Sequence, residues 1–171
     1  MKTEEEQCMR ILTNAVNECK SDWIALSGGL DSSILAHLRK DQKPQTMTII
    51  TKDFLGTDLT FAQIIAKHLG LNLSLIQVSM EEVLDSINET IKILGNYNDI
   101  EIRNSIVPYI YLTTLKKKGV DSVITGDGAD EVFANPRFHP SHDPFIKFFR
   151  VTYYIREQPV NAAILCLELL R

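Results

Sequence analysis

Residues 27–33, Ser-Gly-Gly-Leu-Asp-Ser-Ser, combine the residue types that hold phosphate groups in proteins. Gly28 and Gly29 let the backbone bend sharply and come close to a ligand. The free N–H groups of a helix after such a turn, with the hydroxyls of Ser27 and the later serines, would donate hydrogen bonds to phosphate oxygens. Asp31 would repel a bound phosphate unless a divalent cation lay between the two. The segment therefore predicts a phosphate cradle that works with a metal ion, and the alternative is an ordinary helix cap.

Residues 125–131, Thr-Gly-Asp-Gly-Ala-Asp-Glu, form a second turn that is rich in glycine and acid. Three acids within five residues are costly to crowd together unless cations share them. Mg²⁺ typically takes one or two carboxylates plus phosphate oxygens, which suits Asp31 and Asp130. The alternative is a helix N-terminus whose acids complement the helix dipole. The two turns together predict one site for nucleotide phosphates and magnesium.

Apolar runs precede both turns, and amphipathic stretches lie between these runs. The pattern predicts strands at 23–26, 46–51, 73–78 and 121–125, and helices at 3–19, 31–39, 57–69, 80–94 and 103–118. A polar loop is expected over 96–101, and capping boxes are expected at Thr3 with Glu6 and at Ser79 with Glu82. Alternating strands and helices predict an α/β, Rossmann-like parallel sheet with helices on both faces. Ligands bind at the carboxyl edge of such a sheet, so both turns are expected there.

The character of the sequence changes after residue 133. Residues 134–144 carry three prolines and are expected to form a loop, whereas residues 145–171 have a helical pattern that Pro159 interrupts. We therefore expect a main domain over 1–133 that contains both turns. Residues 134–171 would form an appendage made of a proline-rich loop and short C-terminal helices.

Composition favours an ordinary globular protein. The chain has 171 residues and a net charge of −4, which does not favour general binding to nucleic acid. No apolar stretch is long enough for a membrane span, and the acidic start does not resemble a signal peptide. Three cysteines do not make a disulfide framework, so a reduced, cytoplasmic protein is expected. The sequence contains neither a Walker motif nor a dinucleotide-binding fingerprint.

The two turns carry a resemblance to a known family. Residues 27–32 resemble the pyrophosphate loop (PP-loop) of the N-type ATP pyrophosphatases, and residues 126–131 resemble the Gly-Glu-Gly-Ala-Asp-Glu signature of asparagine synthetases and the related β-lactam synthetases. The likeness covers about residues 20–133. It implies an ATP-dependent, amide-forming ligase with a PP-loop domain over 1–133. In that family a carboxylate, aspartate, attacks the α-phosphate of ATP, pyrophosphate leaves, and ammonia then displaces AMP.

The resemblance also implies roles for individual residues. The residues that would hold the pyrophosphate portion of ATP are Ser27, Gly28, Gly29, Asp31 and Ser32, and those that would bind Mg²⁺ are Asp31 and Asp130. Contacts to the nucleotide would come from Leu26, Thr125 and Gly126, with Thr51 as a further candidate. The candidate catalytic residues are Asp127, Asp130 and Arg103, and the alternative for Arg103 is a structural salt bridge.

The sequence departs from the family pattern in ways that leave alternatives open. Asp127 stands where the family has glutamate, and residues 134–136 replace its Gly-Gly-Tyr. No glutaminase domain is expected in this chain, so ammonia would come from solution or from a separate glutaminase subunit. The alternatives are an ATP-binding subunit or sensor without amidation activity and a PP-loop enzyme that acts on another acceptor, RNA included. The oligomeric state stays open, with a homodimer as one option.

Overall fold

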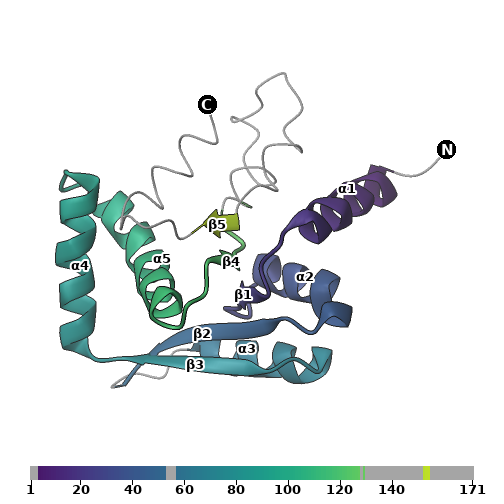
Figure 1. Cartoon of the computed structure of the whole chain (residues 1–171), viewed down its shortest axis with the longest axis horizontal. Helices are drawn as coiled ribbons and strands as arrows, with labels where there is room; N and C mark the ends of the chain where they lie inside the picture. Colours follow the sequence, from purple (N-terminus) through teal and green to yellow (C-terminus); the bar gives the residue numbers. More distant parts are fainter. Residues whose placement is uncertain (1–3, 53–56, 128, 130–151, 155–171) are drawn as a thin grey trace.

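The computed structural model describes residues 4–52, 57–127, 129 and 152–154. These residues form a five-stranded sheet in the order β3-β2-β1-β4-β5, shown in Figure 1. The strands are Trp23–Ala25 (β1), Gln45–Thr51 (β2), Leu73–Val78 (β3), Ser122–Ile124 (β4) and Thr152–Tyr154 (β5). The first four strands are parallel, which confirms the expected Rossmann-like sheet, and β5 pairs antiparallel with β4.

Within the described ranges, five α-helices with defined bounds connect or flank these strands. They are α1 (Glu4–Glu18), α2 (Leu30–Arg39), α3 (Thr57–Leu69), α4 (Met80–Leu94) and α5 (Asp99–Lys117), and a short 3₁₀ helix, η1 (Lys40–Gln42), follows α2. The expected bounds agree with these to within two residues, apart from the start of α5. In the described part of the chain no helix has the length and apolar character needed to cross a membrane.

The expected polar loop over 96–101 is wrong in its second half, because α5 begins at Asp99. The side chain of Asn98 accepts hydrogen bonds from the backbone N–H groups of Ile100 at 3.1 Å and Glu101 at 3.3 Å. An asparagine in this position satisfies donors that a helix start otherwise leaves without partners. Asn98 therefore starts the helix four residues earlier than the apolar pattern indicated.

The helical expectation for 145–171 is wrong at residues 152–154, which form β5. Tyr154 pairs with Ser122, and Thr152 pairs with Ile124. Threonine and tyrosine favour strands, and this local preference prevails over the helical pattern of the wider segment. The other expectations for 134–171 lie outside the described residues, as does Thr3 of the first expected capping box.

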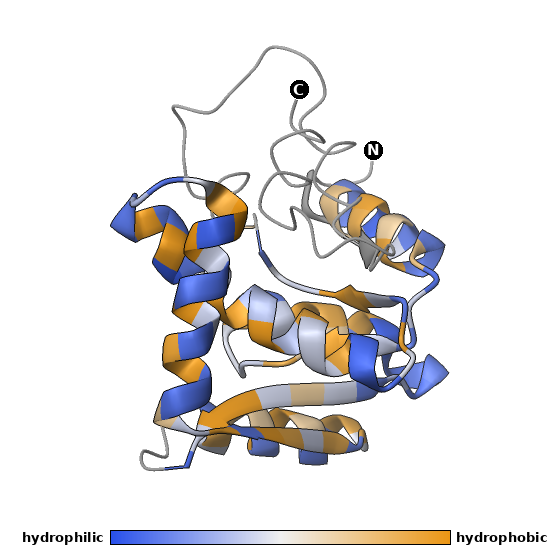
Figure 2. Ribbon diagram, turned by 60° about the vertical axis from the view of Figure 1, so that its left-hand side comes forward, coloured by the Kyte–Doolittle hydropathy of each residue, from blue (hydrophilic) through white to orange (hydrophobic). Residues whose placement is uncertain are grey.

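The sheet is covered on both faces because successive side chains of a strand point to opposite sides. Ile24 and Ile124 pack with α1, α2 and α3, whereas Val123 and Met47 pack with α5. Figure 2 shows how the helices alternate between apolar and polar residues, as expected for elements with one buried face. The two apolar layers hold the carboxyl ends of the strands in fixed positions.

A buried arginine ties α1 to the rest of the domain. Arg39, at the end of α2, donates hydrogen bonds to the backbone carbonyls of Val16 at 3.1 Å, Cys19 at 2.8 Å and Ser21 at 2.8 Å. The last carbonyls of a helix have no partner within the helix itself. The guanidinium group supplies partners for carbonyls at and just beyond the end of α1, and this fixes α1 against α2.

Candidate functional site

The strand order places the two turns beside each other. From β1 the chain proceeds to β2 and β3 on one side of the sheet and then crosses to β4 on the other side of β1. In open parallel sheets the ligand crevice lies at such a switch point, outside the carboxyl ends of the strands. The turn at 27–29 follows β1 and the turn at 125–127 follows β4, so the topology directs both to this crevice.

Direct packing between Gly126 and the start of α2 joins the two turns. A Cβ atom placed on Gly126 would lie 2.9 Å from the Cβ of Asp31 and 3.2 Å from the backbone nitrogen of Ser32. Real side chains do not approach this closely, so only glycine fits at this position. The predicted convergence of the two turns is confirmed for Asp31, Ser32 and Gly126.

A network of hydroxyl groups shapes the first turn. The Ser32 hydroxyl donates to the carbonyl of Gly29 at 3.2 Å and accepts from the backbone N–H of Ser27 at 3.3 Å. The hydroxyl groups of Ser27 and Ser32 lie 3.1 Å apart, and the Ser27 hydroxyl also accepts from the N–H of Gly29 at 3.3 Å. The serines that sequence reasoning assigned to phosphate thus hold the turn itself in a defined shape.

Gly28 is required by packing as well as by its backbone conformation. Its φ angle is +83°, in the left-handed region that favours glycine. A Cβ atom on Gly28 would lie 2.5–2.6 Å from the backbone of Phe61 and Ala62 in α3. Close approach to α3 therefore adds a third reason for glycine, beside the sharp bend and the approach of a ligand that the sequence indicated.

The N-terminus of α2 has no side-chain cap. Gly29 occupies the cap position, and it has no side chain that could accept a hydrogen bond from the first N–H groups. Ser33 donates its hydroxyl back to the carbonyl of Gly29 at 2.7 Å instead of capping. The N-cap residue thus satisfies none of the first N–H groups of α2 with a side chain, and the first turn also carries Asp31.

Two buried residues line the strand ends beneath these turns. Leu26 is buried and continues the ladder of β1 through its N–H, which donates to the carbonyl of Met47 at 2.8 Å. Thr125 is buried as well, and its hydroxyl oxygen has no hydrogen-bond partner among the described residues. A buried hydroxyl without a partner costs free energy.

Asp127, in the second turn, contacts a residue that sequence reasoning missed. The hydroxyl of Tyr111, in the middle of α5, donates a hydrogen bond to Oδ2 of Asp127 at 3.1 Å. Tyr111 is only 4% exposed, whereas Asp127 is an exposed residue. No local signal in the sequence links Tyr111 to an acid 16 residues later.

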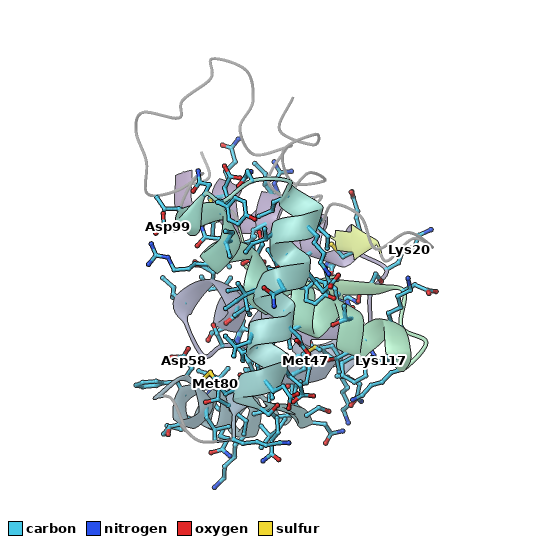
Figure 3. The ribbon with its side chains drawn as sticks, turned by 90° about the vertical axis from the view of Figure 1, so that its left-hand side faces the viewer. Lys20, Met47, Asp58, Met80, Asp99 and Lys117 are labelled. Atoms are coloured by element: carbon cyan, nitrogen blue, oxygen red, sulfur yellow. The ribbon has the colours of Figure 1, made fainter. Side chains whose placement is uncertain are left out.

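The three remaining candidate residues have no described contact with the two turns like that of Gly126 or Asp127. They are Thr51, Arg103 and Asp130. Thr51 ends β2, next to β1, and so lies at the carboxyl edge of the sheet. Arg103 is exposed and forms an ion pair with Asp99 at 2.9 Å, one turn earlier in α5. Figure 3 marks Asp99 at the opposite end of the α4–α5 pair from Met80, the first residue of α4. Asp130 lies outside the described residues.

Metal ligation by the protein alone is not evident in the described part of the chain. No three histidine, cysteine or acidic side chains come together there in a way that could hold a metal ion. Asp31 is the predicted metal ligand whose position is described, and its backbone contacts Gly126 of the second turn.

Known proteins provide the family context for this geometry. The family model for asparagine synthase matches residues 12–163. Asparagine synthetase B [glutamine-hydrolyzing] of Escherichia coli (strain K12) is 34% identical over 124 residues, which cover 64% of this chain and 22% of that protein. The glutamine-hydrolyzing asparagine synthetase of Rattus norvegicus is 33% identical over 117 residues, covering 63% and 20%. The chain thus spans about a fifth of the length of these relatives.

Solved structures share the fold at low sequence identity. NMN synthetase from Francisella tularensis has a TM-score of 0.52 and 17% identity, covering 81% of this chain and 61% of that one. A glutamine-dependent NAD+ synthetase from Acinetobacter baumannii, in complex with ADP, has a TM-score of 0.52 and 16% identity, covering 81% and 28%. These likenesses support the fold, and the match of the family model to most of the sequence shows that this chain belongs to the asparagine synthase family.

Proposed function

We propose that this chain is the ATP-binding part of an amide-forming ligase, with residues 1–133 as its PP-loop domain. It would activate a carboxylate, with aspartate as the leading candidate, by forming an acyl-adenylate and pyrophosphate, and it would then transfer ammonia to the acyl group. The observation that carries this proposal is the packing of Gly126 against Asp31 and Ser32 at the switch point of the sheet. Family membership and the ADP held by the related NAD+ synthetase fold are consistent with it.

The first turn would hold the pyrophosphate portion of ATP. The candidate donors are the uncapped N–H groups of α2 and the hydroxyls of Ser27 and Ser32, whose backbone is set by Gly28 and Gly29. The two hydroxyls can redirect the hydrogens that they donate within the turn toward a phosphate oxygen, and they can still accept from the N–H groups of Ser27 and Gly29. A site whose donors are already in place needs little reorganisation as negative charge develops on the leaving pyrophosphate.

We propose that residues at the carboxyl ends of the strands contact the rest of the nucleotide. Thr125 supports this role best, because its buried hydroxyl lacks a partner that a bound nucleotide would supply. Leu26 and Gly126 line the same switch point, and Thr51 is a further candidate at the edge of the neighbouring strand.

Asp31 and Asp130 are the proposed ligands of Mg²⁺. Their chemistry fits this ion, because Mg²⁺ commonly takes one or two carboxylates and completes its shell with phosphate oxygens and water. When bound, the ion would offset the negative charge of the phosphates and of the departing pyrophosphate. In its absence Asp31 would repel the phosphates held by the same helix N-terminus.

Asp127 is the proposed acid–base residue for the transfer of ammonia. The nitrogen lone pair attacks the acyl carbon, a C–N bond forms, and the bond from that carbon to the phosphate oxygen of AMP breaks. The nitrogen must also lose a proton, and the Asp127 carboxylate is the group that we propose accepts it. Arg103 is proposed to contact the acidic substrate, for which it would have to leave its exposed pair with Asp99.

A reaction with purified components tests this function. The full chain is incubated with ATP, Mg²⁺, ammonia and aspartate, and the release of AMP and pyrophosphate is followed with and without aspartate. Aspartate-dependent release supports the proposal. Tight binding of ATP without release of AMP would point instead to a nucleotide-binding subunit or sensor, and release that requires a different carboxylate would correct the substrate.

A further inference from the structure

The bond between Tyr111 and Asp127 joins the interior of the domain to the second turn. The ring of Tyr111 is buried in the apolar layer beneath β4, together with Met47, Leu115 and Val123. Its hydroxyl reaches out of this layer to Oδ2 of Asp127 at 3.1 Å. The donor is therefore anchored by packing in the core, and the acceptor is an exposed carboxylate on a loop.

This arrangement restrains the carboxylate more than solvent would. An exposed aspartate normally samples several rotamers, because water solvates its oxygens equally well in each. A hydrogen bond from a neutral hydroxyl to an ionised carboxylate is stronger than one between neutral groups, and here the donor cannot follow the acceptor. One oxygen of Asp127 is thereby held in place, while its other oxygen, Oδ1, has no hydrogen-bond partner among the described residues.

We propose that Tyr111 is a positioning residue for the transfer of ammonia. By holding Oδ2 it directs Oδ1 of Asp127 toward the nitrogen that loses its proton. This inference rests on the proposed function, and it deepens that proposal by separating the amination step from the adenylation step. Aspartate is one methylene shorter than the glutamate of the family signature, so a fixed side chain matters more here for reaching the reacting nitrogen.

The matched test compares Tyr111→Phe with Tyr109→Phe on the same helix. Both variants lose one hydroxyl and keep the ring. Tyr109 lies on the side of α5 that faces α4, where partial burial and then the nearby Glu89 raise the pKa of its phenol. Adenylation is measured as aspartate-dependent exchange of pyrophosphate into ATP without ammonia, and amination is measured as formation of the amide after ammonia is added.

The expected result is a split between the two steps. Tyr111→Phe keeps the exchange rate within about twofold and lowers the maximal rate of amide formation by about tenfold to a hundredfold, the effect of one hydrogen bond to a charged group. Tyr109→Phe changes neither step. A merely structural role for the Tyr111 hydroxyl would lower both steps together or neither, and either outcome would overturn the inference.

A second variant keeps the inference testable if Tyr111→Phe does not fold, as judged by its melting temperature. Asp127→Asn changes an exposed side chain and should give the same selective loss of amide formation. Where Tyr111→Phe does fold, adding it to Asp127→Asn should cause no further loss, because the hydroxyl acts through that carboxylate. Normal amination by Asp127→Asn would overturn the inference while leaving the proposed function intact. Absence of aspartate-dependent exchange in the unaltered chain would overturn both.

Discussion

The helices α2 and α4 both follow parallel strands of the same sheet, but their N-termini differ in how the first N–H groups are used. At α4, the Ser79 hydroxyl accepts from the N–H of Glu82 at 3.2 Å, and the Glu82 carboxylate accepts from the N–H of Ser79 at 2.7 Å. At α2, glycine occupies the cap position and has no side chain that could cap the helix. The first N–H groups of α4 are thus capped by side chains of the same helix start, whereas the N-cap residue of α2 provides no side-chain cap.

This is the difference that we expect between a helix start that only stabilises the fold and one that binds a ligand. Both starts contain serine and an acid, so composition alone does not distinguish them. The capping box of α4 satisfies its donors reciprocally and so stabilises the helix. The start of α2 forgoes that stabilisation, and the second turn packs directly against it through Gly126. A helix start that stays uncapped at a sheet switch point is available to bind an anion.

The largest difference in catalytic rate is expected when the acid at the start of α2 or of α4 is removed, because only the acid of α2 is a proposed metal ligand. Asp31→Ala should lower Mg²⁺-dependent release of pyrophosphate by about 10³-fold, because a metal and the charge it offsets contribute several kcal/mol to such reactions. Glu82→Ala, the matched change at α4, should leave this rate unaltered. The rates are measured at saturating ATP, and circular dichroism checks that both variants are folded. Equal rates for Asp31→Ala and the unaltered chain would exclude Asp31 as a metal ligand, and the same test applies to Asp130→Ala.

The next effect is expected on stability, from a methyl group placed on a glycine at each helix. Gly28, before α2, has a φ angle of +83°, and Gly95, at the end of α4, has a φ angle of +66°. A Cβ atom on Gly28 would overlap the backbone of α3, whereas a Cβ atom on Gly95 would meet nothing within 4 Å. Gly28→Ala should therefore lose about 1–3 kcal/mol more free energy of unfolding than Gly95→Ala, since the backbone strain is similar and only the overlap differs.

Urea denaturation of the two variants measures this difference. Gly28→Ala should also weaken ATP binding, because a shift of the first turn away from α3 moves the donors of the cradle. Equal stabilities would mean that the turn moves away from α3 without cost.

Local sequence signals were sufficient for much of this comparison. The capping box at Ser79 with Glu82, the stop at Gly95 and the order of strands and helices follow from residues close together in the sequence. The early start of α5 was also within reach, because Asn98 followed by Glu101 is itself a capping pattern. The polar residues around Asn98 favour a loop and so mask this signal.

The sequence pattern does not predict contacts between residues that lie far apart in the chain. Nothing near Gly28 indicates that α3 packs on it, and nothing near Tyr111 indicates the bond to Asp127. The convergence of the two turns was predicted only because parallel strands end at a common edge, which is a rule of topology. The contact between Gly126 and Asp31 that completes it depends on packing in three dimensions.

Replacing the serine at the start of α4 or of α2 should have smaller effects, on stability in the first case and on ATP affinity in the second. Ser79→Ala removes a cap and should cost about 1 kcal/mol of stability, without a change in ATP affinity. Ser32→Ala should weaken ATP binding by roughly tenfold, the value of one lost hydrogen bond to a charged phosphate. Calorimetry measures the affinity, and thermal unfolding measures the stability. An effect of Ser79→Ala on ATP affinity would contradict the division between a structural and a functional helix start.

The smallest expected effect is on how stability depends on pH through the capping box at the start of α4. The N–H and hydroxyl groups of Ser79 hold the pKa of the Glu82 carboxyl below its ordinary value of 4.5. Folding therefore favours the ionised form, so the contribution of this carboxylate to stability is complete above pH 4.5 and is lost as the pH falls through the lowered pKa. Glu82→Gln should be less stable than the unaltered chain at neutral pH, and the difference should shrink below pH 4.5. Thermal unfolding across this range measures it, and a difference independent of pH would show that the charge of Glu82 adds nothing to the capping box.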